Sequence, residues 1–298
     1  MRHFAGAHDE VVVLSRRAAS LACCRVVPWD GRTLGEWAKE LDGAEVAINL
    51  AGRSVDCRYN SKNLKEMMDS RVDSTRVFGE AIGLAKQPPR VWLQASTATI
   101  YAHRRDAPND EATGILGDDE PGVPRAWNAS IAIAKAWEEA LDAATTPHTR
   151  KVAMRSAMTM SIDKGSVFDV LCSLARSGLG GRLGNGKQYM SWIHEHDFSS
   201  AVQFLIERED LRGPINLASP TPLPQSDFMR VLREVLGVRL ALPAPTWLVE
   251  MGTWAMRTES ELVLKSRRVI PTRLLEAGFH FKYPAWLEAA RDLASRRP

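Results

Sequence analysis

The stretch Val91-Trp92-Leu93-Gln94-Ala95-Ser96-Thr97-Ala98-Thr99-Ile100-Tyr101 decides the fold. A short apolar run passes directly into small hydroxyl side chains and then into a tyrosine. Buried parallel strands are covered on both faces and are therefore continuously apolar, and ligands bind beyond their carboxyl ends. The stretch predicts a buried parallel strand whose carboxyl end carries a polar, hydrogen-bonding site.

Short apolar runs alternate with helical patterns on either side of this stretch. The strands are brief and rich in β-branched residues, whereas apolar residues in the helices recur at helical spacing. This alternation predicts βαβ units, a mostly parallel sheet and right-handed crossovers. The predicted strands are residues 11–14, 24–27, 46–50 and 151–157, and the predicted helices are residues 33–41, 61–86 and 127–144.

The second half of the chain has a different texture. Glycines cluster at residues 177–186, and a proline-rich connector occupies residues 219–224. The simplest architecture is a nucleotide-binding domain with a smaller, partly helical cap built mainly from the C-terminal part. Further helical patterns lie at residues 225–236, 246–256 and 284–293.

Composition and charge exclude several classes of protein. The 298 residues carry a formal net charge of +3 with acids and bases mixed, so no basic block suggests a nucleic-acid partner. Prolines and a glutamate interrupt the most apolar stretch, residues 240–256, and residues 1–10 lack the apolar core of a secretory signal. The four cysteines lack metal-ligand spacing, which predicts reduced thiols and no metal site. We expect a cytoplasmic protein that binds a small molecule, without nucleic-acid or membrane partners.

Seven short motifs follow one another in the order of a known family. They are residues 48–52, 70–76, 96–101, 135–138, 184–189, 192–194 and 271–279. The chain resembles the extended short-chain dehydrogenase/reductase superfamily. More narrowly, it resembles an uncharacterised NAD-dependent epimerase family whose members end in a small C-terminal domain of unknown function. The resemblance implies an α/β fold with a Rossmann-like, doubly wound parallel sheet and a smaller α+β cap. It places the dinucleotide-binding domain at residues 1–160 with about 190–218, and the cap at residues 161–190 and 219–298.

One part of the family pattern is missing. Family members begin with a strand, a Gly-x-x-Gly-x-x-Gly turn and a helix whose N-terminus holds the cofactor pyrophosphate. The segment Met1–His8 has one glycine, so a unit of about 20 residues is absent and the sheet is predicted to lack its usual first strand. Three explanations stay open: a start placed too late, a decayed relative, or direct pairing of residues 11–14 with residues 46–50.

Cofactor binding is predicted from residues that follow two strands. Ser15, Arg16 and Arg17 come after the second strand of the family fold, where an arginine fork suits a 2′-phosphate and therefore favours NADP over NAD. The alternative is a pair of solvated arginines. Asn49, Ala51 and Gly52 would lie beneath the adenine–ribose side, where small residues allow close approach; the alternative there is simply a strand end of small residues.

Catalysis is predicted at the end of the strand that begins at Val91. Thr97 matches the catalytic Ser/Thr of sugar epimerases, and Ser96 is expected beside the cofactor. The superfamily pairs a Tyr proton donor with a Lys four residues later, on one helix face. Lys135 can be aligned with that lysine, but Ile131 then occupies the tyrosine position. Tyr101 is a substitute proton donor. The alternatives are that the hydroxyls cap the next helix, that Tyr101 only packs, and that Lys135 is a surface residue.

Four further residues are assigned to the substrate by the resemblance. They are Thr99, Arg155, His194 and Asn216. For His194 a structural role, ordering a turn and capping a helix, is the competing interpretation. The predicted function is an NADP-dependent oxidoreductase or epimerase-like enzyme for a small polar or sugar-like substrate. The alternative is a degenerate or purely ligand-binding member.

Overall fold

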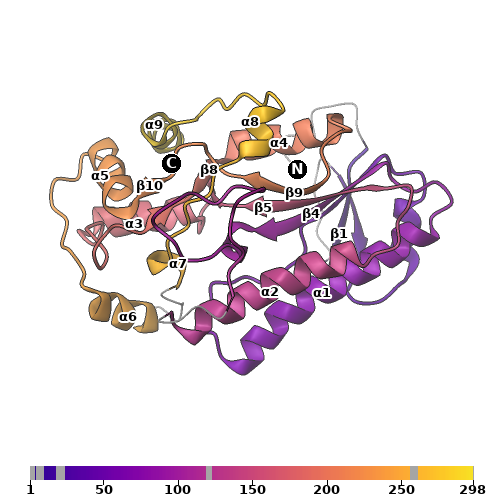
Figure 1. Cartoon of the computed structure of the whole chain (residues 1–298), viewed down its shortest axis with the longest axis horizontal. Helices are drawn as coiled ribbons and strands as arrows, with labels where there is room; N and C mark the ends of the chain where they lie inside the picture. Colours follow the sequence, from indigo (N-terminus) through magenta and orange to yellow (C-terminus); the bar gives the residue numbers. More distant parts are fainter. Residues whose placement is uncertain (1–3, 5–9, 18–23, 119–122, 256–260, 298) are drawn as a thin grey trace.

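The centre of the molecule is a parallel sheet of four strands, in the order β3-β4-β5-β9 (Figure 1). The computed structural model describes residues 4, 10–17, 24–118, 123–255 and 261–297. The non-consecutive neighbours β5 and β9 require a crossover, as expected of an α/β fold. The strands are β3 (Val46–Asn49), β4 (Val91–Thr97), β5 (Arg150–Ser156) and β9 (Gly213–Leu217).

Side chains of β4 alternate between two helical layers. Val91 and Leu93 belong to a core with α4 (Glu195–Glu207), whereas Trp92 packs with Phe78 of α1 on the other side. Helices α1 and α2 lie side by side below the sheet in Figure 1, and α4 and α8 lie above it. Both faces are therefore covered, which is why β4 is apolar at successive positions. The bounds of the other three helices are α1 (Ser61–Leu84), α2 (Arg125–Asp142) and α8 (Thr272–Glu276).

Two N-terminal strands form a separate parallel pair. β1 (Val12–Ser15) is hydrogen-bonded to β2 (Arg25–Pro28), and within the described residues neither strand is bonded to β3. A parallel sheet of Rossmann type is therefore confirmed, and direct pairing of residues 11–14 with residues 46–50 is wrong for the described chain. The segment Met1–His8 lies outside the described residues, except for Phe4, which packs against the same core as Val46.

A second core forms beyond β5. Helices α3 (Val167–Arg176), α5 (Gln225–Val235) and α9 (Trp286–Arg296) enclose Trp192 and Trp286, whose ring centroids are 5.0 Å apart. The remaining elements are β6 (Met158–Met160), β7 (Tyr189–Met190), β8 (Trp192–His194), β10 (Leu223–Pro224), α6 (Thr246–Ala255), α7 (Glu261–Leu264), and the 3₁₀ helices η1 (Glu36–Leu41) and η2 (Ala98–Ile100).

The first predicted helix differs from expectation. It is a single 3₁₀ segment that begins at Glu36, and Thr33 does not cap it. Instead the Thr33 hydroxyl donates to the Asp30 carboxylate at 2.6 Å, and the Trp37 indole donates to the Thr33 carbonyl. The local turn at Asp30 outcompetes a longer helix because it uses the same hydroxyl. In the described ranges, no helix combines the length and apolar character needed to cross a membrane.

Gly79 lets α1 approach the sheet closely, which yields a first prediction. A Cβ at this position would lie 2.7 Å from the Ala144 Cβ and 3.2 Å from the Trp92 ring. We expect Gly79→Ala to lower the free energy of unfolding by about 1–2 kcal/mol, because overpacking outweighs the gain in helix propensity. Urea unfolding of Gly79→Ala, Ala144→Gly and the double variant tests this. If the double variant loses the sum of both single effects, the Ala144 contact is not the cause.

Candidate functional site

A buried polar network lies at the carboxyl ends of β4, β5 and β9. Arg155 from β5 donates from Nε and Nη2 to the two carboxylate oxygens of Glu138 on α2, at 2.9 and 2.7 Å. The Ser96 hydroxyl donates to the same carboxylate at 2.5 Å. The Arg155 side chain is 7% exposed and that of Glu138 is 14% exposed. Burial alone would lower the pKa of the Arg155 guanidinium, but the Glu138 carboxylate outweighs burial and raises it.

Tyr101 belongs to this network. Its hydroxyl accepts from Arg155 Nη1 at 3.0 Å and donates to Asn216 Oδ1 at 2.9 Å. The ring is buried, with the Arg155 guanidinium 5.1 Å from its centroid. Burial raises the pKa of Tyr101, although Arg155 opposes the shift. Sequence-predicted residues from three different roles, namely Ser96, Tyr101, Arg155 and Asn216, are thus brought together, but inside the protein.

Thr97 and Thr99 lie at the next step along the chain. The Thr97 hydroxyl accepts from the Thr99 backbone N–H at 3.2 Å and so caps η2, while its side chain is only partly buried. The Thr99 carbonyl accepts from Lys265 Nζ at 3.0 Å, and the Thr99 hydroxyl accepts from Arg267 Nε at 3.3 Å. The C-terminal segment therefore closes over Thr99.

Lys265 and Arg267 belong to a buried charged cluster. Both lie at ion-pair distance from Glu261 Oε1, at 3.5 and 3.6 Å, and Ser130 of α2 donates to Glu261 Oε2 at 2.6 Å. Glu261 and Lys265 are 1% and 2% exposed. Burial and the Glu261 carboxylate raise the pKa of Tyr59 to about 12. The cluster joins α2, η2 and the segment after α7.

An apolar residue, Ile131, occupies the position at which the superfamily has its tyrosine proton donor, and it packs in the interior. Ile131 is 2% exposed, whereas Lys135, one helical turn later, is 32% exposed in its side chain. Lys135 Nζ lies 3.7 Å from Asp118, not beside Glu138 or Glu139. Lys135 is therefore accessible for chemistry or binding, and no proton-donating side chain precedes it by one turn.

The predicted cofactor residues lie at the exits of β1 and β3. Arg16 and Arg17 are exposed, and the Ser15 hydroxyl accepts from the Arg17 backbone N–H at 3.2 Å. Asn49 is 2% exposed; its Oδ1 accepts from the Ala51 N–H at 2.9 Å, and its Nδ2 has no partner among the described residues. A buried amide group left unpaired is costly.

Gly52 lies against α1. A Cβ there would come within 3.4 Å of the guanidinium carbon of Arg71. Arg71 in turn donates to the Met67 and Arg53 carbonyls, and its guanidinium carbon lies 4.9 Å from the centroid of the Trp137 ring on α2. The exits of β3 and β4 are thus both tied to α2, through Trp137 and Glu138.

His194 has the structural environment of a helix cap. Its Nδ1 accepts from the His196 backbone N–H at 3.0 Å at the start of α4, and its Nε2 lies 3.1 Å from Asp292 of α9. The imidazole stacks on Tyr283 with centroids 4.0 Å apart, and burial lowers the pKa of His194. It joins α4 to α9 and is not part of the Arg155 network.

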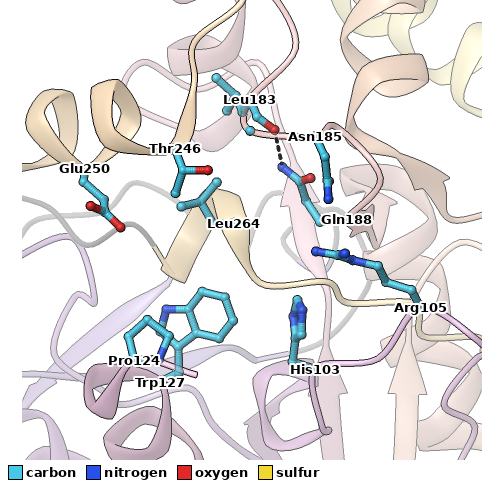
Figure 2. Close-up of a pocket in the computed structure, with 11 residues that line it drawn as sticks. His103, Arg105, Pro124, Trp127, Leu183, Asn185, Gln188, Thr246, Glu250 and Leu264 are labelled. Carbon is cyan, nitrogen blue, oxygen red and sulfur yellow. Dashed lines mark hydrogen bonds between the residues drawn. The ribbon is translucent and has the colours of Figure 1, made fainter. Parts of the chain in front are cut away.

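A cavity of about 210 Å³ opens between the sheet domain and the C-terminal part (Figure 2). Its walls come from His103 and Arg105 after η2, the start of α2, residues 183–185 with Gln188, and helices α6 and α7. His103 and Trp127 meet at its base, with ring centroids 5.1 Å apart. Among the residues that the structure describes, no group of three His, Cys, Asp or Glu could hold a metal ion.

Sequence reasoning missed Glu138, Arg71 and the Glu261 cluster. For Glu138 a signal exists: it follows the buried Ile131 and Ala134 at helical spacing, so its carboxylate falls on the inner face of α2. An acid on a buried helix face requires a partner. The Glu261 cluster has no such local signal, because its partners Thr99 and Ser130 are more than 130 residues away.

The Arg155–Glu138 pair supports a stability prediction. Removing one partner of a buried ion pair leaves the other charge uncompensated, which costs about 3–5 kcal/mol. We expect Glu138→Gln to destabilise the fold by about this amount in urea unfolding. Glu139→Gln, one position along on the exposed face, serves as the matched control and should change stability by less than about 0.5 kcal/mol. Equal stabilities of the two variants would contradict the assignment.

Comparison with known proteins agrees with this fold. The model of the NAD dependent epimerase/dehydratase family matches residues 1–218, and a domain of unknown function matches residues 244–293. Human epimerase family protein SDR39U1 is 28% identical over 263 residues, covering 87% of this chain and 85% of that protein.

Two solved structures have the same fold. The human SDR39U1 structure, determined with NADPH, has a TM-score of 0.82 and 26% identity, and covers 96% of this chain and 91% of its own. A nucleoside-diphosphate sugar epimerase from Corynebacterium glutamicum has a TM-score of 0.73 and 25% identity, and covers 97% of this chain and 53% of its own. With a family match across most of its length, the chain belongs to the NAD dependent epimerase/dehydratase family.

Proposed function

We propose that this chain is an NADP-dependent oxidoreductase or epimerase-like protein that acts on a small polar substrate. The observation that carries the proposal is the set of polar groups at the exits of three strands: Arg16 after β1, Asn49 at the end of β3 and Thr97 at the end of β4. Ligands of open α/β sheets bind beyond the carboxyl ends of the strands.

The residues present fit the adenosine end of NADP. Arg16 and Arg17 are exposed, and a guanidinium can bind a 2′-phosphate with two parallel hydrogen bonds. The unpartnered Nδ2 of Asn49 can donate to a ribose or phosphate oxygen. Gly52, whose missing Cβ leaves space that the Arg71 guanidinium occupies, is proposed to contact the cofactor through its backbone. The similarity to human SDR39U1, whose structure was solved with NADPH, supports the same cofactor here.

Two residues are proposed to act on the substrate. The Thr97 hydroxyl can hold the reacting oxygen because its side chain is only partly buried. Lys135 can supply positive charge or a proton, since its ammonium group reaches solvent. The bound nicotinamide would supply or accept the hydride. Tyr101 is proposed as a positioning residue, because Arg155 and Asn216 already engage its hydroxyl.

A second candidate function is ligand binding without turnover. It is favoured by Ile131, which fills the place of the superfamily's proton donor and is buried. A protein of this kind would retain NADP affinity and lack hydride transfer. Cofactor binding and turnover must therefore be measured separately.

The cofactor proposal predicts selectivity for the 2′-phosphate. We expect the double variant Arg16→Gln/Arg17→Gln to bind NADPH about tenfold or more weakly, with little change for NADH, because each charge-assisted bond contributes about 1.5–3 kcal/mol. Titration calorimetry measures both affinities, with Arg230→Gln on the exposed face of α5 as the control. Absence of saturable NADPH binding by the unmodified chain at millimolar concentration would refute cofactor use.

The turnover proposal is tested by NADPH oxidation with a panel of small carbonyl compounds. We expect Thr97→Ala and Lys135→Ala to lower kcat about 100-fold, because each removes a group that acts on the reacting oxygen. If NADPH binds and every compound is inert, the ligand-binding alternative is correct.

Tyr101→Phe should lower the free energy of unfolding by about 1–3 kcal/mol, because it leaves the Asn216 oxygen without its donor.

A further inference from the structure

We propose that the cavity at Trp127 binds a small, flat organic carboxylate, such as a single- or fused-ring aromatic acid. The inference rests on the proposed function only in regarding this ligand as the substrate. Binding itself is argued from the cavity walls and is independent of NADP.

An unused hydrogen-bond donor lies at the cavity. Trp127 lines the cavity and is 7% exposed, and its indole Nε1–H has no partner among the described residues. Buried Trp N–H groups normally find an acceptor, because leaving one unpaired is costly. Figure 2 shows the indole at the base of the cavity, beside Pro124 and below Leu264. The nitrogen itself is buried, so a ligand oxygen satisfies it only after a small shift of the cavity wall.

The walls of the cavity also provide positive electrostatic potential. Pro124 is the N-cap of α2 and provides no side-chain hydrogen bond, so the positive end of an 18-residue helix lies at the cavity wall. Arg105 extends toward the cavity from the side opposite Glu250 (Figure 2) and makes no hydrogen bond or ion pair with any described residue. Together they favour an anion.

His103 does not add to this charge near neutral pH. Burial, with the nearby charges of Arg105, Lys265 and Arg267, lowers the pKa of His103 to about 4. Its Nδ1 accepts from the Ser266 N–H at 2.8 Å, so the neutral ring carries its proton on Nε2. Arg105 is therefore the cation that faces the ligand, and His103 contributes a ring face.

The volume and the lining of the cavity limit the size and the polarity of a ligand. A cavity of about 210 Å³ is smaller than the range of about 300–1,000 Å³ that is typical of sites for larger ligands. Glu250 on α6 lines the cavity on the side opposite Arg105. Leu183, Leu264 and Pro124 supply apolar walls around the indole. These features favour one carboxylate on a flat apolar body over a nucleoside diphosphate.

The test uses 2-naphthoate as the probe and 2-naphthamide as its uncharged analogue. Titration calorimetry with the full chain should give saturable naphthoate binding and at least fivefold weaker amide binding. Arg105→Gln should weaken naphthoate binding about tenfold, and Trp127→Phe about threefold, because they remove a charged and a neutral donor respectively. Arg104→Gln is the matched control, since the Arg104 guanidinium is paired with Asp106 and does not line the cavity.

Several outcomes would overturn the proposal. One is the absence of saturable naphthoate binding at concentrations up to about 10 mM. Others are equal affinities for the acid and the amide, or an unchanged naphthoate affinity in Arg105→Gln. Displacement of naphthoate by UDP-glucose would also overturn it. Each titration is run with and without NADPH. Naphthoate binding with the expected variant pattern but no NADPH binding would uphold this site and refute the proposed function, whereas the converse would refute only this site.

Discussion

The structure depends on neutralising one buried guanidinium. Arg155 stands on a central strand with its side chain 7% exposed, where an unpaired charge would be prohibitive. Glu138 meets it with two hydrogen bonds, and Tyr101 accepts a third. Because these partners come from α2 and from the residues after β4, satisfying Arg155 fixes where the helix and the loop lie against the sheet. Asn216 extends the same network to β9.

This constraint divides the polar edge of the sheet into two parts. Side chains that point inward, such as Ser96 and Tyr101, make their hydrogen bonds within the network and hold the strands together. Thr97 and Lys135 lie outside it and keep exposed surface. A hydroxyl bonded on both sides within the protein cannot also serve a substrate without breaking a buried bond, which costs about 1–3 kcal/mol. The groups proposed for chemistry are therefore those that the network leaves accessible.

Much of the fold could be predicted from the sequence, because its signals are local. The apolar run at Val91 and the helical spacing after Ser61 and Trp127 specify β4, α1 and α2 within a few residues. The separation of β1 from β3 could not be predicted, because the missing Gly-rich unit left direct pairing of these two strands open. The site was harder, because Tyr101 and Asn216 are 115 residues apart and each merely indicates a polar strand end. Whether such a residue faces a ligand or another side chain depends on contacts that no local pattern contains.

The segment that contains Lys265 and Arg267 belongs to the predicted cap in the sequence, but it contacts a residue of the predicted cofactor-binding domain. Lys265 and Arg267 are buried. They lie far from Thr99 in the sequence, yet both donate hydrogen bonds to it. Both cations face the Glu261 carboxylate, and the two Thr99 oxygens accept hydrogen bonds from them. Undocking the segment would break its buried hydrogen bonds to Thr99 and Ser130, which hold it in place. The segment therefore packs against the strand end at Thr99, and its neighbour Leu264 lines the cavity at Trp127.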